Sequence, residues 1–261
     1  MTTAAPAQIL GRHVWSELMT SDSKGAEGFY KTVVGWTSAP FADSPMPYTI
    51  FRRHGDAGVA GLMQIPEGMH MPPFWAMYIA VPKLEDAAAK IARLGGSALS
   101  EVITVPTVGR MQMLKDPQGV PFYILEPEPR EPSPDAEPEI GEASWLELMT
   151  TDAPAAMKFY QDVFGWQPGD AMDMGPMGQY QLFNRGSRMI GGMMNKPPDM
   201  AQIPPNWAIY FRVPDINAAA ARVSANGGTV INGPMEVPGG DWVLNALDPQ
   251  GASFSLHQKN A

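Results

Sequence analysis

The chain has 261 residues, a formal net charge of −9 and no cysteine. The acidic balance argues against nucleic acid and anionic membrane surfaces as partners, because phosphate binding needs basic patches. Without cysteine the chain has no disulfide, thiolate metal site or cysteine nucleophile. No apolar run approaches the roughly 20 residues that span a bilayer. The N-terminus lacks the basic and apolar segments of a signal peptide, so we expect a cytoplasmic protein.

An internal repeat organises the chain. The segment Trp15–Trp36 returns 130 residues later as Trp145–Trp166, with 12 of 22 positions identical. PPFWAMYIAVP and PPNWAIYFRVP follow in matching places, and the turn sequence DPQG occurs late in each half. A register of this kind indicates a duplication. We predict two domains, at residues 9–126 and 141–259, joined by an extended Pro- and Glu-rich linker at 127–140.

The first half is predicted to contain two βαβββ modules after a loose tail that precedes His13. The first module comprises a strand, a helix and three strands at residues 15–20, 23–34, 36–39, 48–54 and 59–65. Ser21-Asp22 marks the start of the helix, and Gly35 ends it in the left-handed conformation. The second module has the same order at residues 75–81, 84–94, 98–105, 110–115 and 120–125. DPQG is a type I turn between its last two strands.

The second half repeats this order from Ala143 to Gln258. Duplicated βαβββ modules with FYxxVxGW early and DPxG late resemble the vicinal oxygen chelate superfamily, which includes glyoxalase I, bleomycin-resistance proteins and extradiol dioxygenases. The closest resemblance is to two-domain glyoxalase-like proteins of bacteria. The resemblance implies an α+β fold of two tandem domains, each a curved, cup-shaped and mostly antiparallel sheet with helices outside. Because one fold hosts many chemistries, the resemblance does not define a reaction.

Strand alternation assigns side chains to the two faces of each implied sheet. Phe122 and Ile124 should pack on the helices, which directs Tyr123 and Leu125 into the first cup. The same alternation directs Ser255 and His257 into the second cup. In the strands that open each half, it directs Trp15, Glu17, Trp145 and Glu147 inward.

The metal site of the superfamily is predicted to be missing. Metal-dependent members draw ligands from a first-strand His, a fifth-strand His and a last-strand carboxylate, and the resemblance places these positions at Trp15, Ala76, Tyr123, Trp145, Ala208 and Ser255. Side chains of Trp, Ala and Ser are not suitable ligands for a divalent ion. An alternative set from nearby positions would use His13, Glu17, Glu147 and His257. We expect no metal and no other cofactor.

Aromatic and polar residues are the remaining candidates for a binding site. The predicted ligand-binding residues are Trp15, Tyr48, Tyr78, Arg110, Tyr123, Trp145, Tyr180, Tyr210, Arg212, Trp242 and His257. Aromatic walls with a few polar groups are typical of small-molecule sites, although the same rings could simply fill the cups. Glu17 and Glu147 are candidate general bases, or else carboxylates bonded to neighbouring groups. Arg110 and Arg212 could bind an anionic group or pair with a glutamate.

Three functions remain open at this point. The first is a metal-free protein that binds a small organic molecule, as a monomer with two pseudo-equivalent domains or as a homodimer. The second is an enzyme, a glyoxalase-type lyase or isomerase acting on a small carbonyl compound with Glu17 or Glu147 as base. The third is a regulatory or interaction protein whose cups are filled. An extradiol dioxygenase ranks last, because it needs two His and a carboxylate on iron.

Overall fold

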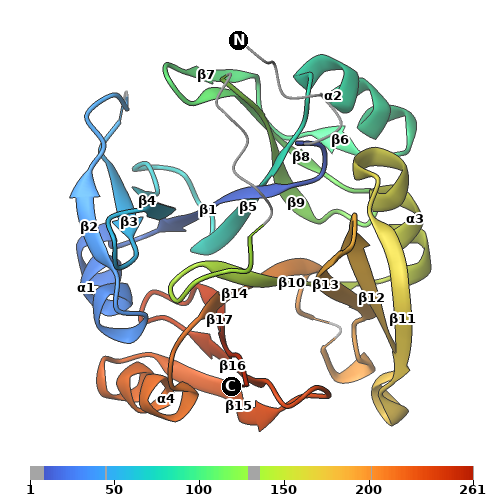
Figure 1. Ribbon diagram of the computed structural model, residues 1–261. Helices are drawn as coiled ribbons and strands as arrows, with labels where there is room; N and C mark the ends of the chain where they lie inside the picture. The colour runs from blue at the N-terminus through green and yellow to red at the C-terminus, as the bar shows by residue number, and fades with distance from the viewer. Residues whose placement is uncertain (1–8, 45, 129–135, 201, 261) are drawn as a thin grey trace. The chain divides into compact units, whose positions relative to one another are not determined.

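The computed structural model describes residues 9–44, 46–128, 136–200 and 202–260 (Figure 1). Most of the predicted N-terminal tail and the middle of the predicted linker lie outside these ranges. Within the described part of the chain, no helix is both long and apolar enough to cross a membrane.

The first half follows the predicted order closely. Its elements are β1 (His13–Thr20), α1 (Ser23–Val33), β2 (Thr37–Pro40), β3 (Tyr48–Arg52), β4 (Gly58–Gln64), β5 (Phe74–Ala80), α2 (Leu84–Arg93), β6 (Ser97–Ala98), β7 (Ile103–Val105), β8 (Gly109–Lys115) and β9 (Pro121–Pro127). One prediction is wrong in detail: the strand expected at 98–105 is two short strands. Both pair with β8, and the chain leaves the ladder between them.

The second half repeats this order with the same kinds of element. They are β10 (Ala143–Thr150), α3 (Ala153–Phe164), β11 (Gln167–Asp173), β12 (Gln179–Arg185), β13 (Arg188–Asn195), β14 (Asn206–Arg212), α4 (Ile216–Ala225), β15 (Thr229–Glu236), β16 (Trp242–Leu247) and β17 (Ser253–Gln258). Single 3-10 turns lie at Gly175–Met177 and Pro198–Met200.

Each half of the sequence contributes one mixed sheet. The first has the strand order β2-β3-β4-β1-β5-β9-β8-β6, with β7 beside β8, and the second has the order β11-β12-β13-β10-β14-β17-β16-β15. The pairs β1–β4 and β5–β9 are parallel, whereas β3–β4 and β8–β9 are antiparallel. The chain therefore has the predicted α+β class, with four βαβββ modules.

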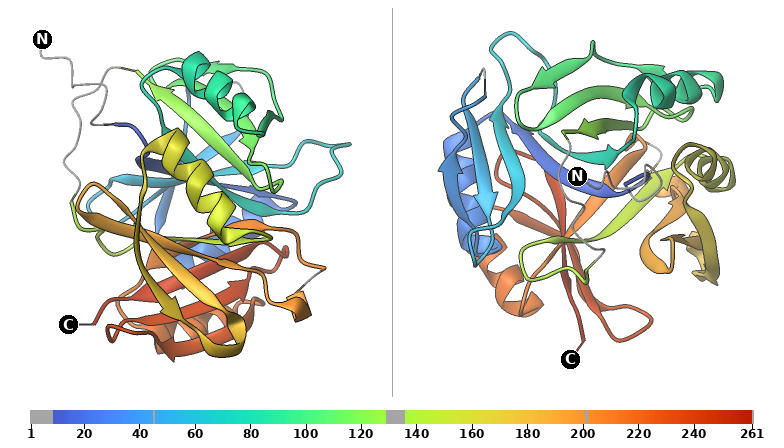
Figure 2. Two further views of the ribbon diagram at one scale, coloured as in Figure 1. Left: turned by 90° about the vertical axis from the view of Figure 1, so that its right-hand side faces the viewer. Right: turned by 45° about the horizontal axis from the view of Figure 1, so that its top comes forward.

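The compact units combine modules from different halves. One unit, here called the module 2/3 unit, contains Met77–Ala136 and Leu146–Trp207. The other, the module 1/4 unit, contains Trp15–Ala76, Glu137–Trp145 and Ala208–Ala261. Within the first of these, α2 and α3 lie side by side in both Figure 1 and Figure 2, and α1 and α4 form the equivalent pair in the second.

Local sequence signals explain how the helices begin and end. The Asp22 carboxylate accepts the Gly25 N–H at the start of α1, and Asp152 does the same for Ala155 in α3. Side-chain caps of this kind satisfy backbone donors that have no partner within the helix. Gly35, with φ of +89°, and Gly165, with φ of +73°, take the predicted left-handed conformation after these helices. Residues that carry a Cβ are strained at such φ values, whereas glycine is not.

A buried chain of hydrogen bonds connects the repeated motifs in the module 1/4 unit. Trp75 Nε1 donates to Tyr30 Oη at 2.8 Å, and this hydroxyl donates to Asp248 Oδ2 at 3.1 Å. The other Asp248 oxygen accepts the Gln250 and Ala252 N–H groups. The Tyr of the FY motif in the first half therefore bonds to the Asp of DPQG in the second half.

The module 2/3 unit contains the reciprocal chain. Trp207 Nε1 donates to Tyr160 Oη at 3.1 Å, which donates to Asp116 Oδ2 at 3.0 Å. DPQG does form the predicted tight turn, since Gly119 N donates to Asp116 O at 3.0 Å. Asp116 of this turn is only 2% exposed and also accepts a hydrogen bond from a buried tyrosine, a role that the turn sequence does not predict. Burial raises the pKa of Asp116 and of Asp248, against the opposing effect of these hydrogen bonds.

Residues just before each half are held in place rather than loose. Trp166 Nε1 donates to Gly11 O at 2.7 Å, and its repeat counterpart Trp36 donates to Gly141 O at 2.9 Å. Gly11 N also bonds to Ala80 O. The prediction of a loose tail is therefore wrong for residues 9–12, because Trp166 donates to the Gly11 carbonyl and the Gly11 N–H donates to Ala80.

Candidate functional site

Three predicted site residues meet in the module 1/4 unit, two of them on β1 and one on β3. Trp15 Nε1 donates to Tyr48 Oη at 2.9 Å, and Tyr48 Oη donates to Glu17 Oε2 at 2.8 Å. Glu17 is only 5% exposed. Gly61 lies opposite Glu17 in the β1–β4 register, and a Cβ on Gly61 would collide with the Tyr48 phenol. The glycine therefore allows the ring to reach the carboxylate.

The second half repeats this arrangement in the module 2/3 unit. Tyr180 Oη donates to Glu147 Oε2 at 2.9 Å, and Gly192 lies opposite Glu147 on β13. A Cβ on Gly192 would collide with the Tyr180 ring. The two candidate bases are thus both held by a phenol. Glu17 is buried and Glu147 is partly exposed, and a carboxylate held in a fixed position is suited to proton abstraction from a substrate that comes within hydrogen-bonding reach.

Tyr78 and Tyr123 form a parallel stack. They are partners in the β5–β9 register, and their ring centroids lie 4.3 Å apart with an interplanar angle of 4°. The exposed fractions are 3% and 8%, so the pair is covered. Neighbouring strand positions pack as predicted, because Phe122 contacts Tyr160 and Phe164 of α3. The two tyrosines lie on the opposite face of the sheet.

The corresponding strands of the module 1/4 unit carry polar groups instead. Phe211 and Leu256 are fully buried cross-strand partners, and Phe211 packs on Trp36 and Trp75. Alternation places the pairs Tyr210–Ser255 and Arg212–His257 on the other face. We call this surface of β14, β16 and β17 the polar face; its members are Tyr210, Arg212, Asn245, Ser255 and His257.

Asn245 connects the first part of the polar face. Its Nδ2 donates to Tyr210 Oη at 3.1 Å and to Ser255 Oγ at 2.8 Å. Asn245 was not among the predicted site residues. An Asn in the interior of an otherwise apolar strand was the available signal, because Asn is depleted in strands.

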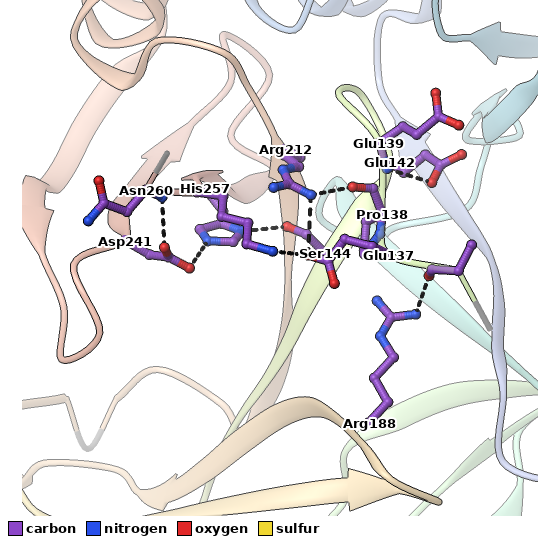
Figure 3. Close-up of polar contacts among 12 residues, drawn as sticks. Glu137, Pro138, Glu139, Glu142, Ser144, Arg188, Arg212, Asp241, His257 and Asn260 are labelled. Atoms are coloured by element: carbon purple, nitrogen blue, oxygen red, sulfur yellow. Dashed lines mark hydrogen bonds and ion pairs between the residues drawn. The ribbon is translucent and has the colours of Figure 1, made fainter.

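His257 is the centre of the second part. Its Nδ1 lies 2.8 Å from Ser144 Oγ, and its Nε2 lies 2.9 Å from Asp241 Oδ2 (Figure 3). Burial acts to raise the pKa of Asp241, but the Asn260 N–H and His257 hydrogen bonds outweigh it and lower that pKa below its ordinary value. Ser144 and Asp241 were also not predicted, since their closeness to His257 depends on three separate segments.

The two predicted anion-binding arginines both contact glutamates. Arg110 bonds to Glu85 and lies 3.6 Å from Glu126. Arg212 Nη1 lies 3.4 Å from Glu137 Oε1 and also donates to Pro138 O (Figure 3). Of the two roles predicted for these arginines, the contacts in the structure match pairing with a glutamate. Trp145 and Trp242 are half-buried, on β10 and β16 respectively.

The residues at the superfamily's metal-ligand positions do not fit a metal. Tyr123 stacks on Tyr78, and Ser255 bonds to Asn245. The remaining positions are Trp15, Ala76, Trp145 and Ala208. Among the described residues, no three His, Asp or Glu side chains gather as a ligand set. Neither the predicted positions nor the alternative set around His13, Glu17, Glu147 and His257 forms one.

Comparison with known proteins places this geometry in a family. The family model "Glyoxalase/Bleomycin resistance protein/Dioxygenase superfamily" matches residues 143–256. CFP32 of Mycobacterium tuberculosis (strain CDC 1551 / Oshkosh), named as a candidate glyoxylase, is 32% identical over 93% of this chain and 92% of its own length. The anthracycline biosynthesis protein DauV of Streptomyces sp. (strain C5) is 28% identical over 98% of this chain and 94% of its own.

Solved structures agree on the fold. The 2,3-dioxygenase LapB from Pseudomonas sp. KL28 matches 97% of this chain and 94% of its own with a TM-score of 0.67 and 13% identity. The Mn(II)-bound glyoxalase from Novosphingobium aromaticivorans matches 95% of this chain and 82% of its own with a TM-score of 0.66 and 15% identity. The chain belongs to the glyoxalase/bleomycin resistance protein/dioxygenase superfamily.

Proposed function

We propose that this protein binds a small organic molecule without a metal, on the surfaces formed by the inward-facing residues of its strands. The observation that supports this proposal is the chemistry at the superfamily's ligand positions, where aromatic, methyl and hydroxyl groups replace His and carboxylate. The polar face offers hydroxyl, amide and imidazole groups, which recognise oxygen-bearing ligands through hydrogen bonds. Aromatic side chains supply the apolar part of such sites.

A binding screen tests the proposal. The probes are small aromatic alcohols, ketones and carboxylic acids, together with an anthracycline, because two relatives are named for anthracycline biosynthesis. Binding is measured by calorimetry on protein treated with chelator, and metal content is measured by elemental analysis. We expect saturable ligand binding by protein that holds less than about a tenth of a metal ion per chain. Stoichiometric zinc, nickel, iron or manganese, with binding lost on its removal, would reject the proposal.

The first half of the chain supplies the matched variants. Asn245→Met and Ser255→Tyr place on the polar face the residues that the first half carries at the corresponding positions, Met113 and Tyr123. Both replacements suit a βαβββ module, so the fold should persist. We expect either variant to weaken an oxygen-bearing ligand roughly 5- to 100-fold, as loss of one or two hydrogen bonds implies. Unchanged affinity in both would place the ligand elsewhere.

A second candidate function is catalysis on a small carbonyl compound, as a glyoxalase-type lyase or isomerase. It is favoured by the phenol-bonded carboxylates Glu17 and Glu147, which recur in both halves. The assay uses the adduct of methylglyoxal with a thiol, with and without added divalent metal. Glu17→Gln or Glu147→Gln should lower turnover about 10²- to 10⁴-fold if that residue is the base. Absence of turnover in wild-type protein under both conditions would reject this function.

A further inference from the structure

The end of the polar face carries a set of side chains that only the second half possesses. Its members are Ser144, Arg212, Asp241, His257 and Lys259. At the corresponding positions of the first half stand Val14, Ala80, Gly109, Leu125 and Pro127, none of which has a polar side chain. Because the two halves share their fold, the fold itself does not require this polar set.

Three basic side chains come together at this end of the strands. Arg212 and His257 are partners in the β14–β17 register, and Lys259 follows β17 directly. The Asp241 carboxylate and the Ser144 hydroxyl hold the two nitrogens of His257 and so fix the imidazole ring. Asp241 also accepts the Asn260 N–H at 2.8 Å, which holds the backbone beside Lys259. The set is therefore positioned by its own hydrogen bonds.

The acidic partner of Arg212 and Lys259 comes from the segment between the halves. Glu137 Oε1 lies 3.4 Å from Arg212 Nη1 (Figure 3) and also lies 2.8 Å from Lys259 Nζ. One carboxylate oxygen thus accepts from both cations. The Glu137 side chain is 62% exposed, whereas that of Arg212 is only 15% exposed. Because the Glu137 side chain lies largely in solvent, water competes for its carboxylate and limits the strength of its ion pairs, so a ligand carboxylate can displace it.

We propose that Arg212 and Lys259 form a binding site for the carboxylate of a small organic acid, and that Glu137 occupies this site as a built-in competitor. This inference rests on the proposed binding function and adds the chemical class of the ligand. A guanidinium binds carboxylates with two parallel N–H donors. Tyr210 lies two residues before Arg212 on the same strand face, where it is buried, so the part of the site beside it is apolar.

The test compares benzoate with benzamide, its neutral analogue, by calorimetry on the full chain at low and high salt. Benzoate should bind wild-type protein at least about 10-fold more tightly than benzamide at low salt, with the difference reduced at high salt. Glu137→Gln should strengthen benzoate binding about 2- to 5-fold, as loss of an exposed competing pair implies. It should leave benzamide unchanged.

Glu139→Gln is the matched control. It removes the same charge from the same segment, but Glu139 pairs with Arg53 instead of Arg212, so benzoate affinity should not change. Arg212→Ala, which introduces the first-half residue, should weaken benzoate at least 10-fold to the level of benzamide. Three outcomes would each overturn this inference and leave the binding function standing. They are equal affinity of wild-type protein for benzoate and benzamide, unchanged benzoate affinity in Glu137→Gln, and equal gains in benzoate affinity from Glu137→Gln and Glu139→Gln. If neither benzoate, benzamide nor any compound of the earlier screen binds, the proposed binding function is rejected together with this inference.

Discussion

The substitution Tyr30→Phe removes a single hydroxyl group but should lower the free energy of unfolding by several kcal/mol. The hydroxyl that it removes accepts from Trp75 Nε1 and donates to Asp248 Oδ2, and both partners are more than nine-tenths buried. The phenyl ring can keep its contacts with Phe29, Trp36 and Phe254. The cost therefore comes from two polar groups that lose their partner without gaining water.

Leaving a buried donor or acceptor unsatisfied costs about 1–3 kcal/mol. Loss of partners for the Trp75 indole and one Asp248 oxygen thus predicts a decrease of about 2–5 kcal/mol in the free energy of unfolding. For a protein of this size, about 2–4 °C per kcal/mol gives a decrease in Tm of about 5–15 °C. Tyr160→Phe should have a similar effect, because it breaks the reciprocal chain from Trp207 to Asp116.

Urea denaturation followed by tryptophan fluorescence and by circular dichroism measures the change. Thr32→Ala is the control, because it removes an exposed hydroxyl from the same helix, where Thr32 Oγ1 bonds to Gly28 O. We expect it to cost less than about 1 kcal/mol. If Tyr30→Phe costs no more than Thr32→Ala, the hydrogen-bond chain does not stabilise the fold and this reasoning is wrong.

Three further predictions concern the buried tyrosine hydroxyls, Gly61 and Arg110. Burial and the neighbouring carboxylates raise the pKa of Tyr30 and of Tyr160 well above the ordinary value of a tyrosine. As the pH rises, the unfolded chain therefore releases these two protons before the folded chain does. The free energy of unfolding should fall as the pH rises above about 10, with a smaller slope in Tyr30→Phe. Denaturation midpoints between about pH 9 and 11 check the sign, and a flat profile would refute it. Gly61→Ala should destabilise by about 1–3 kcal/mol because its Cβ collides with the Tyr48 phenol. In a Tyr48→Ala background the same substitution should cost little, and an equal cost in both backgrounds would contradict the contact. Arg110→Gln should leave the Tm unchanged, because its ion pairs with Glu85 and Glu126 are solvent-exposed; a clear decrease in Tm would show that the pair is structural.

The sequence predicted most of the local structure. The repeat, the apolar periodicity, the Asp caps and the glycines after the helices gave the order of the modules and nearly all their bounds. Alternation also predicted correctly that Phe122 packs on a helix. These signals are local, since each depends on residues close together along the chain.

Which residues meet across the fold was decided by the tertiary structure. FY and DPQG occur in both halves, and nothing in their periodicity indicates that Tyr30 bonds to Asp248 rather than to Asp116. The same holds for the contacts of His257: Ser144 lies on β10, Asp241 directly before β16 and His257 on β17, and only the strand order β10-β14-β17-β16 brings them together. Alternation defines the direction of a side chain, whereas its partner depends on strand order and module packing, which are long-range properties of the folded chain.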